Sequence, residues 1–454
     1  MADRPAATLL HLGPGLGNGL ANLHNARKAN TPMVNVVGEH ATYHIEHDAP
    51  LTADIEGIAR PVSHWVRTSL SAKDVARDGA EAVAAAMTPP GQIATLVLPA
   101  NTAWEAGEGE AAPLTVPARA QVESEAVRRS AEILRGPGET LLLLTGHALR
   151  EYPLELAGRI AAKTGAKLMA QGSNARLQRG AGRVPVNRVP FPVDQALDVL
   201  KDFQQIILVG AKAPVAFFAY PNKPSLLYPD GCEIHTLSAL EADAVHALEW
   251  LADELGATGS AANVQAAQRP DRPTGALTKD SIAAALGALL PDQAIVADES
   301  VTTGRGFYPL TAGAPPHCWL NNMGGSIGLG MPLATGAAVA CPDRKVVCLE
   351  GDGSGMYTLQ ALWTQARDGL DVTTVVFANR TYEILKGELA NVGASNPGRK
   401  ALDMLELGRP DLDWVAMSRG MGVAAERVEN VDDFQTAFAR GLAEPGPYLV
   451  EVIL

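Results

Sequence analysis

Short aliphatic segments recur along this chain, and the stretches between them carry apolar residues at helical spacing. Strands that alternate with helices pair in parallel, because each helix crosses over between neighbouring strands. The pattern therefore predicts an α/β fold built from doubly wound parallel sheets. The predicted strands are residues 6–11, 33–37, 93–98, 140–145, 167–170, 205–209, 294–298, 345–349, 372–377 and 448–453.

Two stretches interrupt this pattern, from Asn101 to about Pro117 and from Thr258 to Thr274. Both lack aliphatic periodicity and contain Pro and Gly, as linkers between domains usually do. We therefore expect three doubly wound parallel-sheet domains at residues 1–115, 120–258 and 275–454. Ligands of such sheets bind at the carboxyl ends of the strands, so the residues directly after each strand are the candidate site residues.

Charge and composition exclude several classes of binding partner and indicate the cellular compartment. The formal net charge is −13 and no Lys/Arg cluster is present, which disfavours nucleic acid and anionic membranes as partners. No apolar run approaches the roughly 20 residues of a membrane span, and the first residues do not resemble a signal peptide. The cysteines show no paired spacing, so we expect reduced thiols and a cytoplasmic protein. They are Cys232, Cys318, Cys341 and Cys348.

The segment 345–349 is followed by a Gly-Asp-Gly-Ser motif that begins at Gly351, and the next strand ends before Asn379. Parallel strands joined by one crossover end at the same sheet edge, so Asp352 and Asn379 are expected to lie close together. A carboxylate, an amide oxygen and the backbone carbonyl of Thr381 would suit Mg²⁺. Gly351 and Gly353 would let backbone N–H groups approach a phosphate. Gly-Asp-Gly alone is also common in turns.

The helix expected after this motif ends at Asp368-Gly369. Apolar residues fall at helical spacing within it, and we expect them to pack against the sheet. These residues are Leu359, Leu362, Trp363 and Ala366.

Residues 351–364 and Asn379-Arg-Thr-Tyr382 resemble the thiamine-diphosphate (ThDP) dependent enzymes, in particular the group of acetolactate synthase and benzoylformate decarboxylase. The resemblance implies a pyrimidine-binding, a central and a diphosphate-binding domain. It also implies that Gly351, Gly353 and Ser354 hold the diphosphate. Asp352, Asn379 and the Thr381 carbonyl would bind Mg²⁺.

The stretch 322–332 resembles the family segment that places a bulky hydrophobic side chain beneath the cofactor. This assigns Ile327 to that role, with Gly325 and Ser326 beside it. The side chain would hold the cofactor bent, with its 4′-amino group beside C2–H; plain core packing is the alternative role of Ile327. Ser300 lies in a stretch that resembles a cofactor-side loop, where it would bind diphosphate or cap a helix.

The first segment resembles the pyrimidine-binding domain, and His11 matches a histidine that handles protons beside the thiazolium in the decarboxylases. A histidine after a strand can also be purely structural. The Gly-rich turn from Gly13 suggests a dinucleotide-binding motif as well, but Asn18 stands where that motif needs glycine. We therefore reject a dinucleotide site there.

The resemblance implies an enzyme that decarboxylates a small 2-oxo acid and then releases an aldehyde or joins the product to a second carbonyl compound. It also implies a homodimer or homotetramer with sites shared between chains. FAD occupies the central domain of true acetolactate synthases, but Gly180-Ala-Gly182 does not form a flavin fingerprint. FAD is therefore possible but not supported.

In the family, a glutamate that activates the pyrimidine precedes the histidine matched by His11. Family spacing places it before Met1, so we expect either a truncated chain or a natural short form. The alternative function is accordingly a non-catalytic ThDP-binding or structural subunit.

Overall fold

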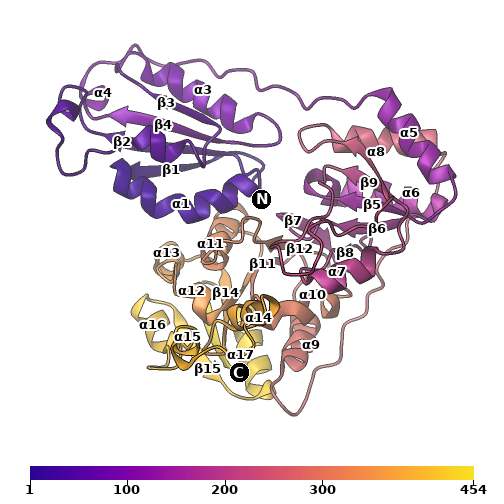
Figure 1. Cartoon of the computed structure of the whole chain (residues 1–454). Helices are drawn as coiled ribbons and strands as arrows, with labels where there is room; N and C mark the ends of the chain where they lie inside the picture. The colour runs from indigo at the N-terminus through magenta and orange to yellow at the C-terminus, as the bar shows by residue number, and fades with distance from the viewer. The chain divides into compact units, whose positions relative to one another are not determined.

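The computed structural model describes residues 1–454 (Figure 1). The chain forms two compact units: Met1–Ala120 with Met323–Ser326, and Gln121–Asn322 with Ile327–Leu454. The first unit contains one sheet and the second contains two. The predicted α/β class, with parallel pairing in each of three sheets, is confirmed. The residue bounds of three domains remain a prediction.

The sheet of the first unit has the strand order β1-β2-β4-β3, with all pairs parallel. Its side chains feed two cores, one on each face: Val37 and Val97 pack with helices α1 and α2, and Ala94 and Leu96 pack with α3. The elements are β1 (Ala6–His11), α1 (Leu12–Lys28), β2 (Met33–Glu39), η1 (Ile45–His47), α2 (Ile55–Ala59), β3 (Trp65–Thr68), α3 (Val75–Met87), β4 (Ile93–Pro99) and α4 (Asn101–Trp104).

Helix α1 includes the Gly-rich residues from Gly13, which the sequence suggested as a turn. The helix instead begins at Leu12, directly after β1. Pro14 falls in the first helical turn, where backbone N–H groups lack intrahelical acceptors, so its missing N–H costs nothing there. The Gly-rich residues therefore form the first turns of α1.

The second unit begins with a five-stranded sheet of order β10-β9-β5-β6-β8. Strand β5 is buried on both faces, because Leu142 and Leu144 join one core while Leu141 and Leu143 join another. The elements are α5 (Ser124–Arg135), β5 (Thr140–Leu144), η2 (Gly146–Leu149), α6 (Glu151–Thr164), β6 (Lys167–Ala170), β8 (Asn187–Arg188), α7 (Val193–Leu200), β9 (Gln205–Val209), β10 (Glu233–Ser238) and α8 (Ala244–Glu254).

The same unit carries a seven-stranded sheet of order β15-β16-β14-β13-β11-β12-β7. Its elements are β7 (Arg176–Arg179), α9 (Lys279–Leu289), β11 (Ile295–Glu299), η3 (Thr303–Gly306), α10 (Phe307–Leu310), β12 (His317–Asn321), α11 (Gly330–Ala340), β13 (Val346–Gly351), α12 (Asp352–Gly355), α13 (Ala361–Asp368), β14 (Val372–Ala378), α14 (Glu383–Asn391), α15 (Arg399–Asp403), α16 (Trp414–Gly420), β15 (Ala424–Val428), α17 (Val431–Ala443) and β16 (Tyr448–Ile453).

Strand β7 was not predicted and departs from the parallel pattern. It comes from the middle of the chain yet pairs antiparallel with β12, placing Arg179 opposite His317 and Arg176 opposite Leu320. Arg179 is buried there: it donates hydrogen bonds to the Thr311 hydroxyl at 2.7 Å and the Tyr308 carbonyl at 2.6 Å. Strand β7 therefore belongs to the sheet of the last segment.

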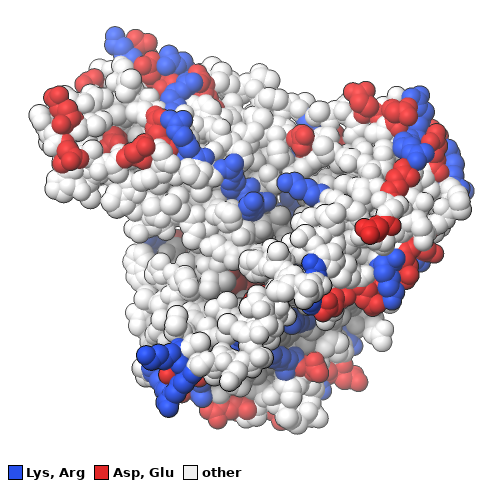
Figure 2. Space-filling model, in the orientation of Figure 1, with Lys and Arg blue, Asp and Glu red and all other residues white.

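None of the helices is both long enough and apolar enough to cross a membrane. Figure 2 shows acidic and basic side chains interspersed on the visible face, with broad uncharged areas between them.

Candidate active site

Strands β13 and β14 are parallel neighbours, and Gly351 lies opposite Phe377 at their carboxyl ends. Asp352 and Asn379 therefore leave the sheet at the same edge. The backbone N–H of Arg380 donates to Asp352 Oδ2 at 2.7 Å, and that of Gly353 donates to Asp352 Oδ1 at 2.9 Å. A direct hydrogen bond thus joins the Gly-Asp-Gly-Ser motif to the segment that follows β14.

Asp352 is only 3% exposed and forms no salt bridge. Burial raises the pKa of this carboxyl to about 6, although the N–H groups of Arg380 and Gly353 partly offset the effect. A buried carboxylate without an ion-pair partner is costly unless a cation joins it. Its surroundings therefore fit a bound cation.

Asn379 and Thr381 complete the oxygen donors expected for a metal. The Asn379 amide oxygen accepts the Thr381 N–H at 3.1 Å, which orients the amide at the sheet edge. No group of three His, Cys, Asp or Glu side chains is placed to hold a metal. The donor set of one carboxylate, one amide and one carbonyl instead suits Mg²⁺, which takes hard oxygen ligands and keeps sites open for phosphate oxygens.

The glycines of the motif have different surroundings. A Cβ on Gly353 would lie 2.5 Å from Tyr382 Cε1, and one on Gly355 would lie 2.7 Å from the Trp414 ring. A Cβ on Gly351 would meet only ordinary contacts, the nearest at 3.6 Å. Gly353 and Gly355 are therefore needed for close packing against aromatic rings, a reason that the sequence did not reveal.

The helix expected after the motif is interrupted. Helix α12 ends at Gly355 and α13 begins at Ala361, with i to i+3 hydrogen bonds between them. Ser354 is buried within α12. Leu362 is buried as predicted, but Leu359 and Ala366 are only partly buried, and the prediction for Trp363 is wrong because this residue is 52% exposed.

Glu299 is a residue of this region to which the sequence assigned no role. It ends β11, and its Oε2 accepts the backbone N–H groups of Gly328, Leu329 and Gly330 at 3.1, 2.7 and 2.8 Å. Glu299 thereby fixes the loop that follows Ile327, which is half-buried. In the sequence, the only signal for this interaction was an acidic residue at the end of a strand and a Gly-rich stretch farther along the chain.

Glu350 lies opposite Glu299 on the neighbouring strand β13 and is completely buried. Neither of its carboxyl oxygens forms a hydrogen bond of normal geometry. Burial, and secondarily the nearby Glu299, raise the pKa of Glu350 well above its usual range. A Cβ on Gly330 would lie 2.3 Å from Glu350 Oε2, so a side chain at this position would displace the buried carboxyl group.

Ser300 is buried, and its hydroxyl donates to Asp298 Oδ1 at 2.5 Å. The short helix η3 has Thr302 as its N-cap, so Ser300 does not have the capping role weighed from the sequence. Gly325 and Ser326 are grouped with the first unit, whereas Ile327 belongs to the second. Within the first unit, His11 is exposed at the end of β1 and precedes α1 as its N-cap.

Three non-glycine residues with left-handed backbone directly follow predicted site residues. They are Leu12 after His11, Val301 after Ser300 and Arg380 after Asn379, with φ of 56°, 49° and 56°. Such conformations cost about 1–3 kcal/mol each and are concentrated at functional sites. Each strained residue therefore lies directly after a residue that the sequence proposed for the site, and no sequence pattern identified the strain.

Family models match two parts of the chain: "Thiamine pyrophosphate enzyme, N-terminal TPP binding domain" at residues 1–58 and "Thiamine pyrophosphate enzyme, C-terminal TPP binding domain" at residues 304–452. The Mycobacterium tuberculosis protein IlvX, whose name assigns it provisionally to the acetolactate synthase large subunits, is 51% identical over 455 residues, covering 100% of this chain and 87% of that protein.

Two further relatives are decarboxylases. Benzoylformate decarboxylase of Pseudomonas aeruginosa is 28% identical over 482 residues, covering 99% of this chain and 87% of that protein. The solved thiamine diphosphate-dependent 4-hydroxybenzoylformate decarboxylase of Rhodococcus jostii RHA1 has a TM-score of 0.83 at 25% identity. That alignment covers 98% of this chain and 87% of the other.

Proposed function

Because the chain belongs to the thiamine pyrophosphate (ThDP) enzyme family, we propose that it binds ThDP together with Mg²⁺ and decarboxylates a small 2-oxo acid. The observation that carries the proposal is the hydrogen bond between the Arg380 N–H and Asp352 Oδ2, which brings the two proposed metal-binding segments together. The proposal includes carboligation to a second carbonyl compound as an alternative fate of the product. It also includes a homodimer or homotetramer with sites shared between chains.

The residues have distinct proposed tasks. Asp352, the Asn379 amide and the Thr381 carbonyl hold Mg²⁺, while Gly351, Gly353 and Ser354 line the diphosphate; Ser300, Gly325 and Ser326 are proposed to lie beside the cofactor. Ile327 supports the cofactor rings with its half-buried side chain. When bound, ThDP supplies an electron sink for the electron pair that CO₂ leaves behind. His11 is proposed to move a proton at the reacting carbon.

The test of this function is CO₂ release from a panel of small 2-oxo acids, including aromatic and aliphatic members. We expect release to require both ThDP and Mg²⁺ and to stop after dialysis against EDTA, since the diphosphate would lose its bridging cation. Release that persists in metal-free buffer would contradict the metal assignment. Tight ThDP binding without CO₂ release from any acid would favour the non-catalytic alternative.

The pH dependence of metal binding offers a separate prediction. Burial raises the pKa of Asp352 to about 6, so below that pH a proton occupies the carboxylate that the metal needs. The affinity for Mg²⁺ with ThDP is expected to be constant well above pH 6 and to fall by up to about tenfold per pH unit below it. Calorimetric titrations between about pH 5 and pH 8 measure this dependence.

A titration of Mg²⁺ into ThDP without protein corrects for protonation of the diphosphate itself. The matched variant Asn379→Ala removes a neutral ligand, so it should weaken binding while leaving the inflection near pH 6 in place. A corrected affinity that stays flat across the range would show that Asp352 is not a ligand.

A further inference from the structure

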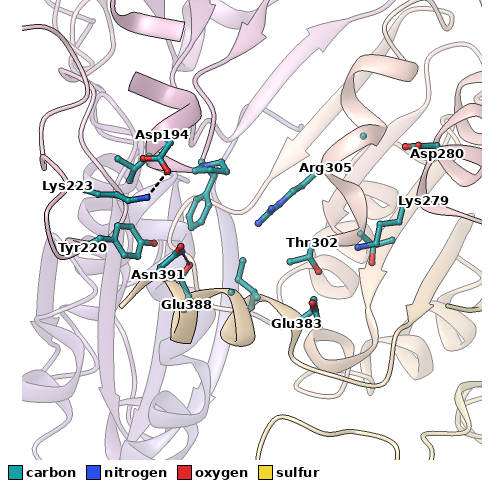
Figure 3. Close-up of a pocket in the computed structure, with 17 residues that line it drawn as sticks. Asp194, Tyr220, Lys223, Lys279, Asp280, Thr302, Arg305, Glu383, Glu388 and Asn391 are labelled. Atoms are coloured by element: carbon teal, nitrogen blue, oxygen red, sulfur yellow. Dashed lines mark hydrogen bonds and ion pairs between the residues drawn. The ribbon is translucent and has the colours of Figure 1, made fainter. Parts of the chain in front are cut away.

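The second unit contains an open cavity of about 540 Å³ beside helix α14, here called the α14 cavity (Figure 3). Its walls come from the start of α7, the loop carrying Tyr220 and Lys223, the start of α9, helix η3 and helix α14. Its volume lies within the range of small-molecule sites. A cavity of this size, lined by many polar groups, can accept a small polar ligand.

Two walls of the α14 cavity begin directly after residues assigned to the cofactor. Helix α14 starts two positions after Thr381, and the lining residue Thr302 follows Ser300 by two positions. Residues at the carboxyl ends of β11 and β14 therefore continue straight into the cavity walls. This continuity makes the α14 cavity a candidate for the substrate side of the proposed site.

Most charged groups around the α14 cavity already have partners. Lys223 Nζ contacts Asp194 at 2.7 Å, and Glu383 contacts Lys386 at 3.4 Å. Glu388 accepts from the Asn391 amide at 3.4 Å, and burial together with a hydrogen bond to Glu388 raises the pKa of Tyr220. The carboxylates of Asp194, Glu383 and Glu388 thus already have partners within the protein.

Arg305 differs from these groups, because it lines the cavity and its side chain forms neither an ion pair nor a hydrogen bond. Figure 3 shows its side chain extending from η3 into the middle of the cavity, across from the Asp194–Lys223 pair. Lys279 adds a second cation on the same side. The neighbouring Asp280 lies in the first turn of α9, where the helix dipole favours a negative charge.

The planar fork of a guanidinium matches a carboxylate with two parallel hydrogen bonds. The departing carboxylate of a 2-oxo acid is a poor partner for such a group, because it becomes neutral CO₂ in the reaction. An arginine bound to it would favour the ground state over the transition state and slow the chemical step. A carboxylate that the product retains carries no such penalty.

We propose that Arg305 binds a second carboxylate at the far end of the substrate, so that the enzyme selects a 2-oxo dicarboxylic acid. This inference rests on the proposed function and adds the substrate class to it. Arg305 is then a residue that determines specificity.

The test compares two five-carbon acids, 2-oxopentanedioate and 2-oxopentanoate, which differ only in the second carboxylate. Binding to the full chain is measured by calorimetry with Mg²⁺ and an unreactive ThDP analogue, so that no acid is consumed. We expect the dicarboxylate to bind at least about tenfold more tightly, as hydrogen bonds to charged groups usually give. Arg305→Gln should abolish this preference while changing the affinity for 2-oxopentanoate less than about twofold.

Arg305→Lys keeps the charge without the fork and should restore part of the preference. Arg399→Gln removes another exposed arginine of the same unit, outside the cavity, and should change nothing. Equal affinities of the wild-type protein for both acids, or an equal loss for both in Arg305→Gln, would overturn the inference. Failure of the analogue to bind would instead refute the proposed cofactor site and the inference with it.

Discussion

Replacing Asp352 with alanine is expected to lower the affinity for ThDP in the presence of Mg²⁺ by at least about a hundredfold. Asp352 is the only carboxylate among the proposed metal ligands, and substitutions of residues that merely support a metal ligand already cost about 10–100-fold. Without the proposed metal, a bound diphosphate would lose its main counter-charge at the edge between β13 and β14. Calorimetry with Mg²⁺ held in excess measures the loss directly.

A folding defect must be separated from this loss of binding. Asp352→Ala leaves the backbone N–H groups of Gly353 and Arg380 without their acceptor, at an expected cost of about 1–3 kcal/mol in the free energy of unfolding. Asp352→Asn keeps one acceptor and should lose affinity with a smaller loss of stability. Asp368→Ala removes an exposed acid of the same segment and serves as the control. Unchanged ThDP affinity in a folded Asp352→Ala protein would end the metal assignment.

Replacing His11 with alanine is expected to lower the rate of CO₂ release by about 10² to 10⁴-fold while ThDP affinity stays within about threefold. Positioned proton transfer commonly contributes a factor of this size. His11 is exposed at the end of β1, so its removal should cost little folding free energy. Single-turnover measurements at saturating ThDP separate the chemical step from cofactor binding.

The matched control is His47→Ala, which removes another exposed histidine of the first unit, in η1. It should leave the rate unchanged. If both substitutions lower the rate equally, or if His11→Ala loses ThDP affinity in proportion to its activity, the proton-transfer role of His11 is wrong.

Ten of the sixteen strands could be predicted because most of these ten are continuous aliphatic runs, such as Leu141–Leu144 in β5, which packs on both faces. The burial of α13 could not be predicted in the same way. Its buried face includes Gln365, whose amide donates to Thr335 Oγ1 at 3.0 Å, while Trp363 faces solvent. A pattern of hydrophobic residues cannot predict that a polar residue will be buried through its hydrogen bonds.

The proposed metal residues could be located because local motifs follow strands that share a sheet edge. The supporting interactions could not, since they connect segments far apart in the sequence. Glu299 meets the N–H groups of Gly328–Gly330 only after β11 and α11 have packed together. The spacing of Gly353 against the Tyr382 ring likewise depends on how α12 and α14 emerge from neighbouring strands.

The antiparallel strand β7 determines whether the middle and last segments of the chain can be separated into stable fragments. It is donated by the middle of the chain but completes the sheet of the last segment beside β12, so the two segments should unfold together. A fragment beginning after the second linker would expose the edge of β12, next to the buried Trp319. Such a fragment would present an unpaired template for aggregation. Proteolytic nicking between residues 261 and 274 should therefore yield two pieces that remain associated.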